Sequence, residues 1–199
     1  LPIGEGAAEV RLRGTDLVIA DAGRAVAIAG VKGGALTAVT NTTTDILLEA
    51  ATFAPTAVRA ASRGLRISSD SSYRFERGVH PAQVNPAADR LAEIILAVAG
   101  GELCTTVVSD GAPLPEPRRI TLRFERCRRL LGIDLPTERI VQWLSTLGFD
   151  PRVDGEVVHC VAPHFRLDIE REVDLVEEVA RMAGLDLLPV VDTVAIPPA

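Results

Sequence analysis

The chain has 199 residues, of which 47% are hydrophobic, 24% are charged and 4% are aromatic, enough for one large domain or two small ones. This composition excludes a disordered, collagen-like or disulfide-framed protein. Its 21 basic and 27 acidic residues give a formal net charge of −6, so any contact with nucleic acid must be local.

The N-terminal part of the chain mixes short apolar runs with helical patterns. The runs at 16–21 and 25–30 flank the turn-forming residues 22–24, which indicates a strand, a turn and a second strand. Pro55 suits the first turn of a helix, because its missing N–H costs little there. The predicted elements are strands over 16–21, 25–30 and 45–50 and helices over 56–63 and 86–98. Because strands and helices do not alternate regularly, we expect an α+β fold.

Residues 111–117 contain three prolines and a glycine without apolar periodicity, which is typical of a linker. We therefore predict one domain over residues 1–110 and a second over residues 118–192. The elements predicted in the second domain are a strand over 119–124, helices over 126–131 and 136–147, a hairpin over 149–161 and a helix over 172–183. This order is the outline of a small winged-helix-like α+β domain.

The cysteines and the apolar runs bear on where the protein resides. Cys104, Cys127 and Cys160 form no C-x-x-C pair, which favours a reducing cytosol, and we expect each of them in a core. No apolar run approaches the ~20 residues of a membrane span, so we predict a cytoplasmic protein without a membrane partner. The chain begins with Leu-Pro rather than Met, and we interpret it as a fragment of a longer protein.

Two features of the first domain are candidates for a ligand site. The loop Ala29–Gly34 follows a predicted strand, and its glycines would let backbone groups approach a ligand. The alternative is a plain tight turn between strands. Glu49 is an acid inside an apolar run, so it either points to solvent or lies in a pocket.

The segment 68–81 mixes hydroxyls, arginines, acids and aromatic residues ahead of a helix. One interpretation is a hydrogen-bonded loop with ion pairs among Arg74, Glu76 and Arg77. The other is the wall of a polar pocket or an RNA contact. Composition does not decide between them.

In the second domain Asp174, Glu177 and Glu178 share one side of the last predicted helix, and Asp168 precedes it. A hard divalent cation would offset the repulsion among these carboxylates. The alternative is that the helix dipole and nearby arginines stabilise them. The basic cluster of this domain is either a solvated face or an RNA footprint, and it comprises Arg118, Arg119, Arg123, Arg126, Arg128 and Arg129.

Four segments in this order resemble the beta subunit of bacterial phenylalanyl-tRNA synthetase, and the resemblance covers nearly the whole chain. They are Ala29–Gly34, Leu47–Ala50, Arg74–Gly78 and Asp168–Ala183. The resemblance implies that the first domain is the C-terminal part of an editing domain, truncated at its N-terminal side. The second would be the winged-helix-like B5 domain that follows it.

In that family the editing domain hydrolyses tyrosine wrongly attached to the phenylalanine tRNA. The resemblance implies that Glu49 accepts the tyrosine hydroxyl and that Ala29, Gly30, Gly33 and Ser71 line the editing pocket. It assigns no catalytic side chain, and the attacking water would be held by backbone groups and by hydroxyls of the tRNA. A second site is needed because a pocket that accommodates phenylalanine rejects an isostere with one extra hydroxyl only weakly.

The resemblance further implies that Asp168, Asp174, Glu177 and Glu178 bind Mg²⁺ near the contact with the alpha subunit, where ATP-dependent aminoacylation occurs. The implied partners are therefore the alpha subunit and tRNA-Phe, and we expect the isolated fragment to be inactive in aminoacylation. The rival hypothesis is a non-catalytic nucleic-acid-binding or scaffold module, because the second domain has a winged-helix outline.

Overall fold

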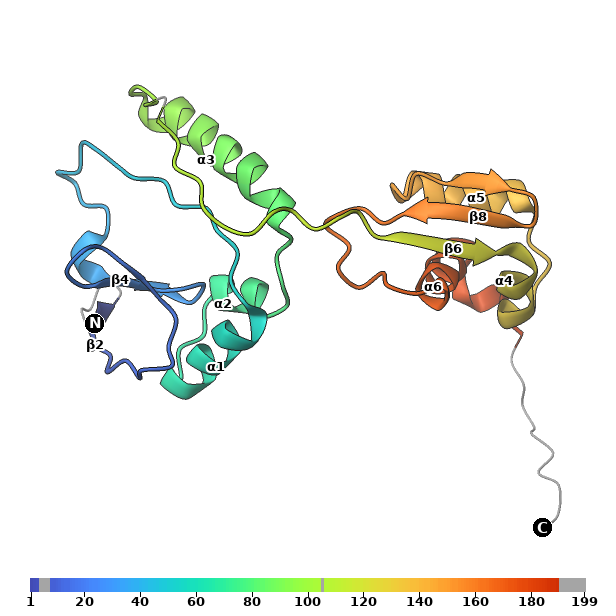
Figure 1. Cartoon of the computed structure of the whole chain (residues 1–199), viewed down its shortest axis with the longest axis horizontal. Helices are drawn as coiled ribbons and strands as arrows, with labels where there is room; N and C mark the ends of the chain where they lie inside the picture. The colour runs from blue at the N-terminus through green and yellow to red at the C-terminus, as the bar shows by residue number, and fades with distance from the viewer. Residues whose placement is uncertain (4–7, 105, 190–199) are drawn as a thin grey trace, which may run out of the picture. The chain divides into compact units, whose positions relative to one another are not determined.

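The computed structural model describes residues 1–3, 8–104 and 106–189. The chain divides into two compact units, the first ending at Leu114 and the second beginning at Pro115. Figure 1 labels helices and strands of both units. Each unit has a hydrophobic core of its own. Helices and antiparallel sheets occur in both units, which confirms the predicted α+β class.

The first unit contains two small antiparallel sheets. Its three-stranded sheet has the order β3-β4-β5, and the turn between the first two strands closes when Asp21 accepts the N–H groups of Gly23 and Arg24, both at 2.8 Å. The predicted strand, turn and strand are therefore confirmed. The strands of this unit are β1 (Pro2–Ile3), β2 (Ala8–Glu9), β3 (Val18–Ala20), β4 (Ala25–Ile28) and β5 (Lys32–Gly33).

Three helices accompany these strands: α1 (Pro55–Leu65), α2 (Asp70–Phe75) and α3 (Val84–Ala99), with short 3₁₀ turns at Ala35–Thr37 and Pro81–Gln83. Helices α1 and α3 confirm the two predicted helices, whereas α2 was not predicted. The core of the unit is small, and it consists of Ile28, Val31, Val58 and Ala61 with a partly buried apolar rim.

The strand predicted over 45–50 is wrong. This segment forms no ladder with another strand, and Leu47 at its centre is 95% exposed. A run of four apolar and two acidic residues fits a strand only where a neighbouring strand supplies hydrogen bonds, and here the backbone crosses the unit without one.

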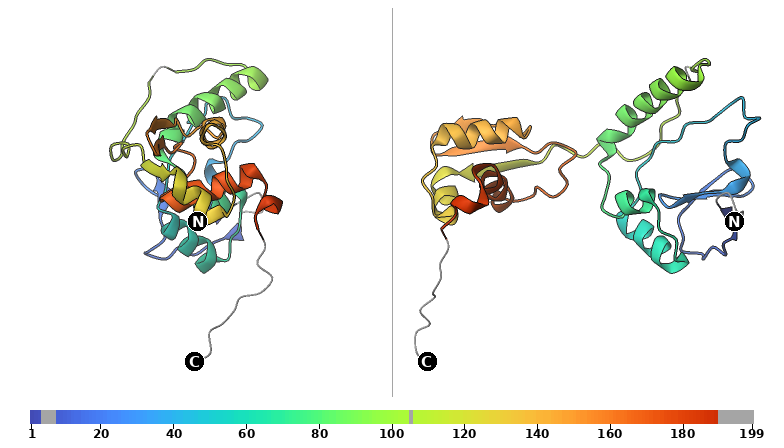
Figure 2. Two further views of the ribbon diagram at one scale, coloured as in Figure 1. Left: turned by 90° about the vertical axis from the view of Figure 1, so that its right-hand side faces the viewer. Right: turned by 180° about the vertical axis from the view of Figure 1, so that it is seen from behind.

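The second unit is a three-stranded antiparallel sheet with three helices on one face. Figure 2, in its right-hand view, shows α5 in front of the strands. The sheet has the order β6-β8-β7, and Ile120, Leu122, Val158 and Cys160 turn toward the helices. The elements are β6 (Arg119–Arg123), α4 (Phe124–Leu131), α5 (Thr137–Thr146), β7 (Arg152–Asp154), β8 (Val157–Val161), α6 (Glu172–Ala183) and a 3₁₀ turn at Leu185–Leu187.

All the elements predicted for the second unit are present, because its apolar periodicity matches its burial. Strand β6 alternates exposed and buried residues, as an edge strand with one wet face should. Gly155, with φ +55°, makes the turn of the hairpin. Cys127 and Cys160 lie in this core as expected, whereas the same expectation is wrong for Cys104, which is exposed.

Among the residues that the structure describes, no helix is both long and apolar enough to span a membrane.

Candidate functional site

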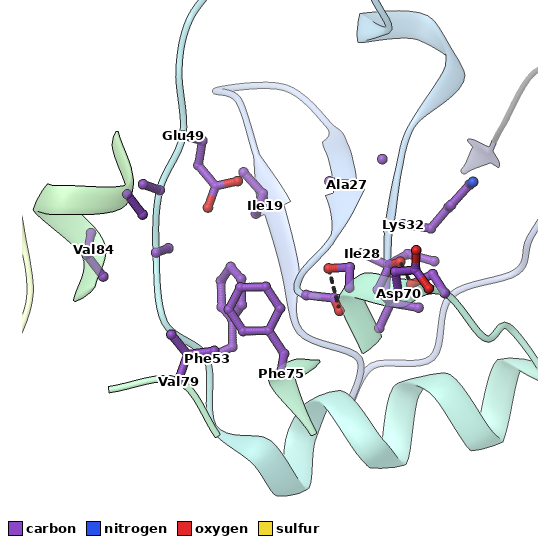
Figure 3. Close-up of a pocket in the computed structure, with 18 of the residues that line it drawn as sticks. Ile19, Ala27, Ile28, Lys32, Glu49, Phe53, Asp70, Phe75, Val79 and Val84 are labelled. Atoms are coloured by element: carbon purple, nitrogen blue, oxygen red, sulfur yellow. Dashed lines mark hydrogen bonds between the residues drawn. The ribbon is translucent and has the colours of Figure 1, made fainter. Parts of the chain in front are cut away.

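The first unit contains a cavity of about 600 Å³ (Figure 3). Its walls come from β3 and β4, from the glycine loop 30–33 that follows them, from the extended segment 49–53, and from the starts of α2 and α3. The rings of Phe53 and Phe75 pack at 5.2 Å between centroids and form an aromatic wall. Most of the other lining residues are apolar too, and the polar ones are Lys32, Glu49, Ser69, Asp70, Ser71 and Gln83.

Glu49 supplies one of the two carboxylates that line this cavity, and Asp70 supplies the other. The Glu49 side chain points inward, toward Ile19 and not toward Lys32, which extends away on the other side of the opening (Figure 3). Within the described residues no hydrogen bond or ion pair reaches Glu49. Glu49 is an exposed residue, and the partial desolvation that it does experience raises its pKa. The group is an acceptor without a partner, and so it is available to a ligand.

The glycine loop is shaped by Gly30. Its φ is +66°, and a Cβ at this position would lie 3.0 Å from Val58, 3.1 Å from Phe53 and 3.3 Å from Phe75. Gly30 therefore needs both its left-handed backbone and its missing side chain. Gly33 is different, since a Cβ there would meet nothing within 4 Å and would face the open cavity.

Two serines at the start of α2 hold the glycine loop in place. Ser71 donates to the carbonyl of Gly30 at 3.0 Å, and Ser69 donates to the carbonyl of Val31 at 2.6 Å. Ser69 is also the N-cap of α2, and it exchanges hydrogen bonds with Ser72 in a capping box. These hydrogen bonds thus fix the glycine loop to the start of α2, and both segments line the cavity.

In the second unit, the acids of α6 are held by arginines. Arg166 donates to both oxygens of Glu178, at 2.8 and 3.0 Å, and to both oxygens of Asp168, at 2.6 and 2.9 Å. Arg181 also bonds to Glu178. Hydrogen bonds from Arg166 lower the pKa of Asp168 and of Glu178.

The other two acids lie apart from this bridge. Asp174 accepts the backbone N–H groups of Glu170 and Arg171, at 2.9 and 2.7 Å, ahead of α6, and these bonds lower its pKa. Glu177 is exposed. Among the described residues there is no group of three or more histidine, cysteine, aspartate or glutamate side chains placed to hold a metal ion.

Comparison with known proteins identifies both units. Residues 3–100 match the B3/4 domain, and residues 120–185 match the tRNA synthetase B5 domain. The chain is also 40% identical, over 89% of its length, to the phenylalanine–tRNA ligase beta subunit of Rhodopirellula baltica. The chain belongs to the phenylalanine–tRNA ligase beta subunit family.

Other relatives with the same name give similar values. The beta subunit of Salinibacter ruber is 40% identical over 91% of the chain, and that of Syntrophotalea carbinolica is 43% identical over 90%. The chain spans about a quarter of the length of these relatives, between 22% and 26%.

The B3/4 domain brings most of the predicted pocket residues together. Gly30, Gly33, Glu49 and Ser71 all line the cavity. Ala29 does not, because it is buried behind the wall, where its N–H donates to the carbonyl of Leu17 at 3.0 Å. Their role in editing stays a prediction.

Sequence reasoning missed the aromatic wall and the two serine tethers. Segment 68–81 matches part of each interpretation. The cavity lining includes Ser69, Asp70, Ser71 and Phe75. Arg77 pairs with Glu76 at 3.0 Å, whereas within the described residues no ion pair includes Arg74. The signal that could have found the tethers is Ser69-x-x-Ser72, a capping-box pattern ahead of a helix.

The B5 domain does not fit magnesium as its acids are placed. Magnesium requires near-octahedral oxygen ligands at about 2.0–2.1 Å, whereas the carboxylate oxygens of Asp168 and Glu178 already contact guanidinium groups. The four acids do not converge, because Arg166 stands between two of them and the backbone binds a third. The placement of these acids therefore does not support the magnesium binding predicted for them.

The basic cluster of the B5 domain is largely engaged inside the domain. Arg123 and Arg126 pair with Glu172 at 2.7 and 3.2 Å, and Arg128 donates to the carbonyl of Leu135 at 2.8 Å. Arg118 pairs with Glu170 at 3.2 Å. These contacts favour a structural role over an RNA footprint.

Proposed function

We propose that the chain is part of the beta subunit of a phenylalanine–tRNA ligase, which attaches phenylalanine to tRNA-Phe with ATP, and that its B3/4 domain contributes to hydrolysis of tyrosine attached by mistake. Aminoacylation would take place on the alpha subunit, which together with tRNA-Phe would be its partner. The observation that carries this proposal is Glu49, an unpaired carboxylate that faces into an apolar cavity with an aromatic wall.

The chemistry of this cavity suits a phenol. The rings of Phe53 and Phe75 offer apolar contact to an aromatic side chain, and Glu49 offers an acceptor to its hydroxyl. Phenylalanine would fill the same space but leave the carboxylate unpaired and more strongly desolvated. A site built to hydrogen-bond a hydroxyl discriminates strongly against a ligand that lacks it, because that ligand leaves a polar group of the site unpaired.

The residues that line the cavity include no histidine or cysteine in the described part of the chain, so they offer no nucleophile paired with a base. We therefore assign hydrolysis to a water molecule rather than to a side chain. Backbone groups of the loop 30–33, which Ser69 and Ser71 hold in place, would position that water together with hydroxyls of the bound tRNA.

The test uses the αβ enzyme that contains this beta subunit, with Glu49→Ala and, as a matched control, Glu93→Ala on the exposed face of α3. Glu49→Ala should slow hydrolysis of Tyr-tRNA-Phe by about tenfold to a hundredfold and leave charging with phenylalanine near the wild-type rate. The control should change neither. Wild-type Tyr-tRNA-Phe hydrolysis by Glu49→Ala would overturn the proposal.

A second candidate function is a non-catalytic nucleic-acid-binding or scaffold module. The order of strand, two helices, hairpin and helix in the second unit favours it. Binding of the whole chain to duplex RNA that weakens steeply with salt, without any effect of Glu49→Ala on editing, would support this alternative.

A further inference from the structure

Glu178 is one of two buried polar side chains in the described part of the chain, with an exposed fraction of 3%. It lies on α6 between hydrophobic core residues, so its charge needs compensation. Arg166 reaches it from the loop that precedes α6, and Arg181 reaches it from one turn further along the helix. Both oxygens of the carboxylate therefore contact a guanidinium group.

Arg166 bridges two carboxylates at once. Its Nε and one terminal nitrogen bind Asp168, and both terminal nitrogens bind Glu178. A planar guanidinium presents donors in a fixed fork, which matches two carboxylates better than a point charge does. The side chains of Arg166 and Glu178 are 20% and 4% exposed, so this half of the bridge is shielded from most of the solvent. The Asp168 half is open to solvent, since the Asp168 side chain is 63% exposed.

We infer that in this chain Arg166 takes the position between Asp168 and Glu178 that a divalent cation would need, so that the acidic cluster of α6 is an arginine-bridged structural network and not a magnesium site.

The charges of this network support the inference. The positive charges of Arg166 and Arg181 balance the negative charges of Asp168 and Glu178. An added Mg²⁺ would therefore leave two uncompensated positive charges next to the buried Glu178. Binding of the ion would also require Arg166 to leave both partners. The remaining acids do not offer an alternative cage, because Asp174 is bound by backbone N–H groups and Glu177 is exposed.

The test is thermal unfolding of the whole chain in EDTA and in millimolar Mg²⁺, followed by the fluorescence of Trp143. This residue is the single tryptophan of the sequence, and it packs against the core of the second unit. The wild type should unfold at the same temperature in both solutions. Glu178→Gln should lower this temperature by about 5–10 °C in both, because it removes the buried carboxylate charge that Arg166 and Arg181 share.

Two further variants keep the test decisive if Glu178→Gln does not fold. Glu177→Gln removes an acid of the same helix without touching the bridge, and it should unfold within about 2 °C of the wild type in both solutions. Arg166→Lys keeps the charge but loses the fork, and it should unfold at a lower temperature in both. Two results would overturn the inference. One is that Mg²⁺ raises the unfolding temperature of the wild type and that Glu177→Gln or Glu178→Gln abolishes this increase. The other is that Arg166→Lys unfolds at the wild-type temperature.

Discussion

Ser69 and Val31 are 38 residues apart in the sequence, yet the serine hydroxyl donates to the valine carbonyl at 2.6 Å. This hydrogen bond joins Ser69, the N-cap residue of α2, to the glycine loop, and both segments line the cavity. The geometry of the cavity therefore depends on a short polar contact as well as on the small apolar core, since Ile28 and Val31 belong to that core and also line the cavity.

The first prediction concerns this tether. Ser69→Ala removes both the cap of α2 and the bond to Val31, so it should destabilise the first unit by about 1–3 kcal/mol. Hydrogen exchange measured by mass spectrometry should become faster in peptides that cover 28–34 and 69–76. Ser68→Ala is the control, because Ser68 is exposed and precedes the cap. Equal protection in both variants would contradict the assigned role.

The second prediction separates two glycines of the same loop. Gly30→Ala combines a left-handed φ with three close contacts, and it should cost about 1–2 kcal/mol or more of the stability of the first unit. Gly33→Ala meets no atom within 4 Å and should be close to neutral for folding. Urea unfolding followed by hydrogen exchange in the first unit measures both, and similar losses from the two substitutions would contradict the prediction.

The third prediction follows from the desolvation of Glu49, which raises its pKa in the folded chain. The folded state then holds its proton more tightly than the unfolded state, so the first unit loses stability as pH rises through the ordinary glutamate range. Glu49→Gln should therefore unfold at a higher temperature than the wild type at neutral pH, and the two should converge in acid. Calorimetry at both pH values measures this, and a neutral-pH loss would contradict it.

The fourth prediction concerns thiol reactivity. Burial raises the pKa of Cys127 to about 11 and that of Cys160 to about 12, whereas Cys104 is exposed. Because the thiolate is the reactive form, iodoacetamide at mildly alkaline pH should label Cys104 alone in the folded chain and all three cysteines in urea. Peptide mass spectrometry locates the labels, and early labelling of Cys160 would show that the second core opens readily.

The second unit could be predicted from the sequence almost completely, whereas the first could not. In β6 and α5 the apolar residues recur with the period of the element that buries them, so pattern and structure agree. Helix α2 has no such period, because its six residues are held by serine hydrogen bonds rather than by an apolar face. The strand predicted at 45–50 failed for the opposite reason, since its apolar residues have no strand beside them.

The candidate site was predicted in part for the same physical reason. Glu49 and Gly30 stand out locally, one as an acid among apolar residues and the other as a glycine after a strand. The packing of Phe53 against Phe75 joins segments 22 residues apart in sequence by tertiary structure, which no local pattern reports. Similarly, the spacing of the acids in α6 was visible, but the position of Arg166 between two of them was not.

The two hydrophobic cores share no residue, and each draws its members from a single unit. A substitution that destabilises the small core around Val58 removes no side chain from the larger core around Leu144, so we expect the second unit to stay folded. In the cell, proteases would then cleave the unfolded first unit, whereas the folded second unit would resist them. Such a substitution would consequently produce a stable proteolytic fragment that contains the second unit, and not complete loss of the chain.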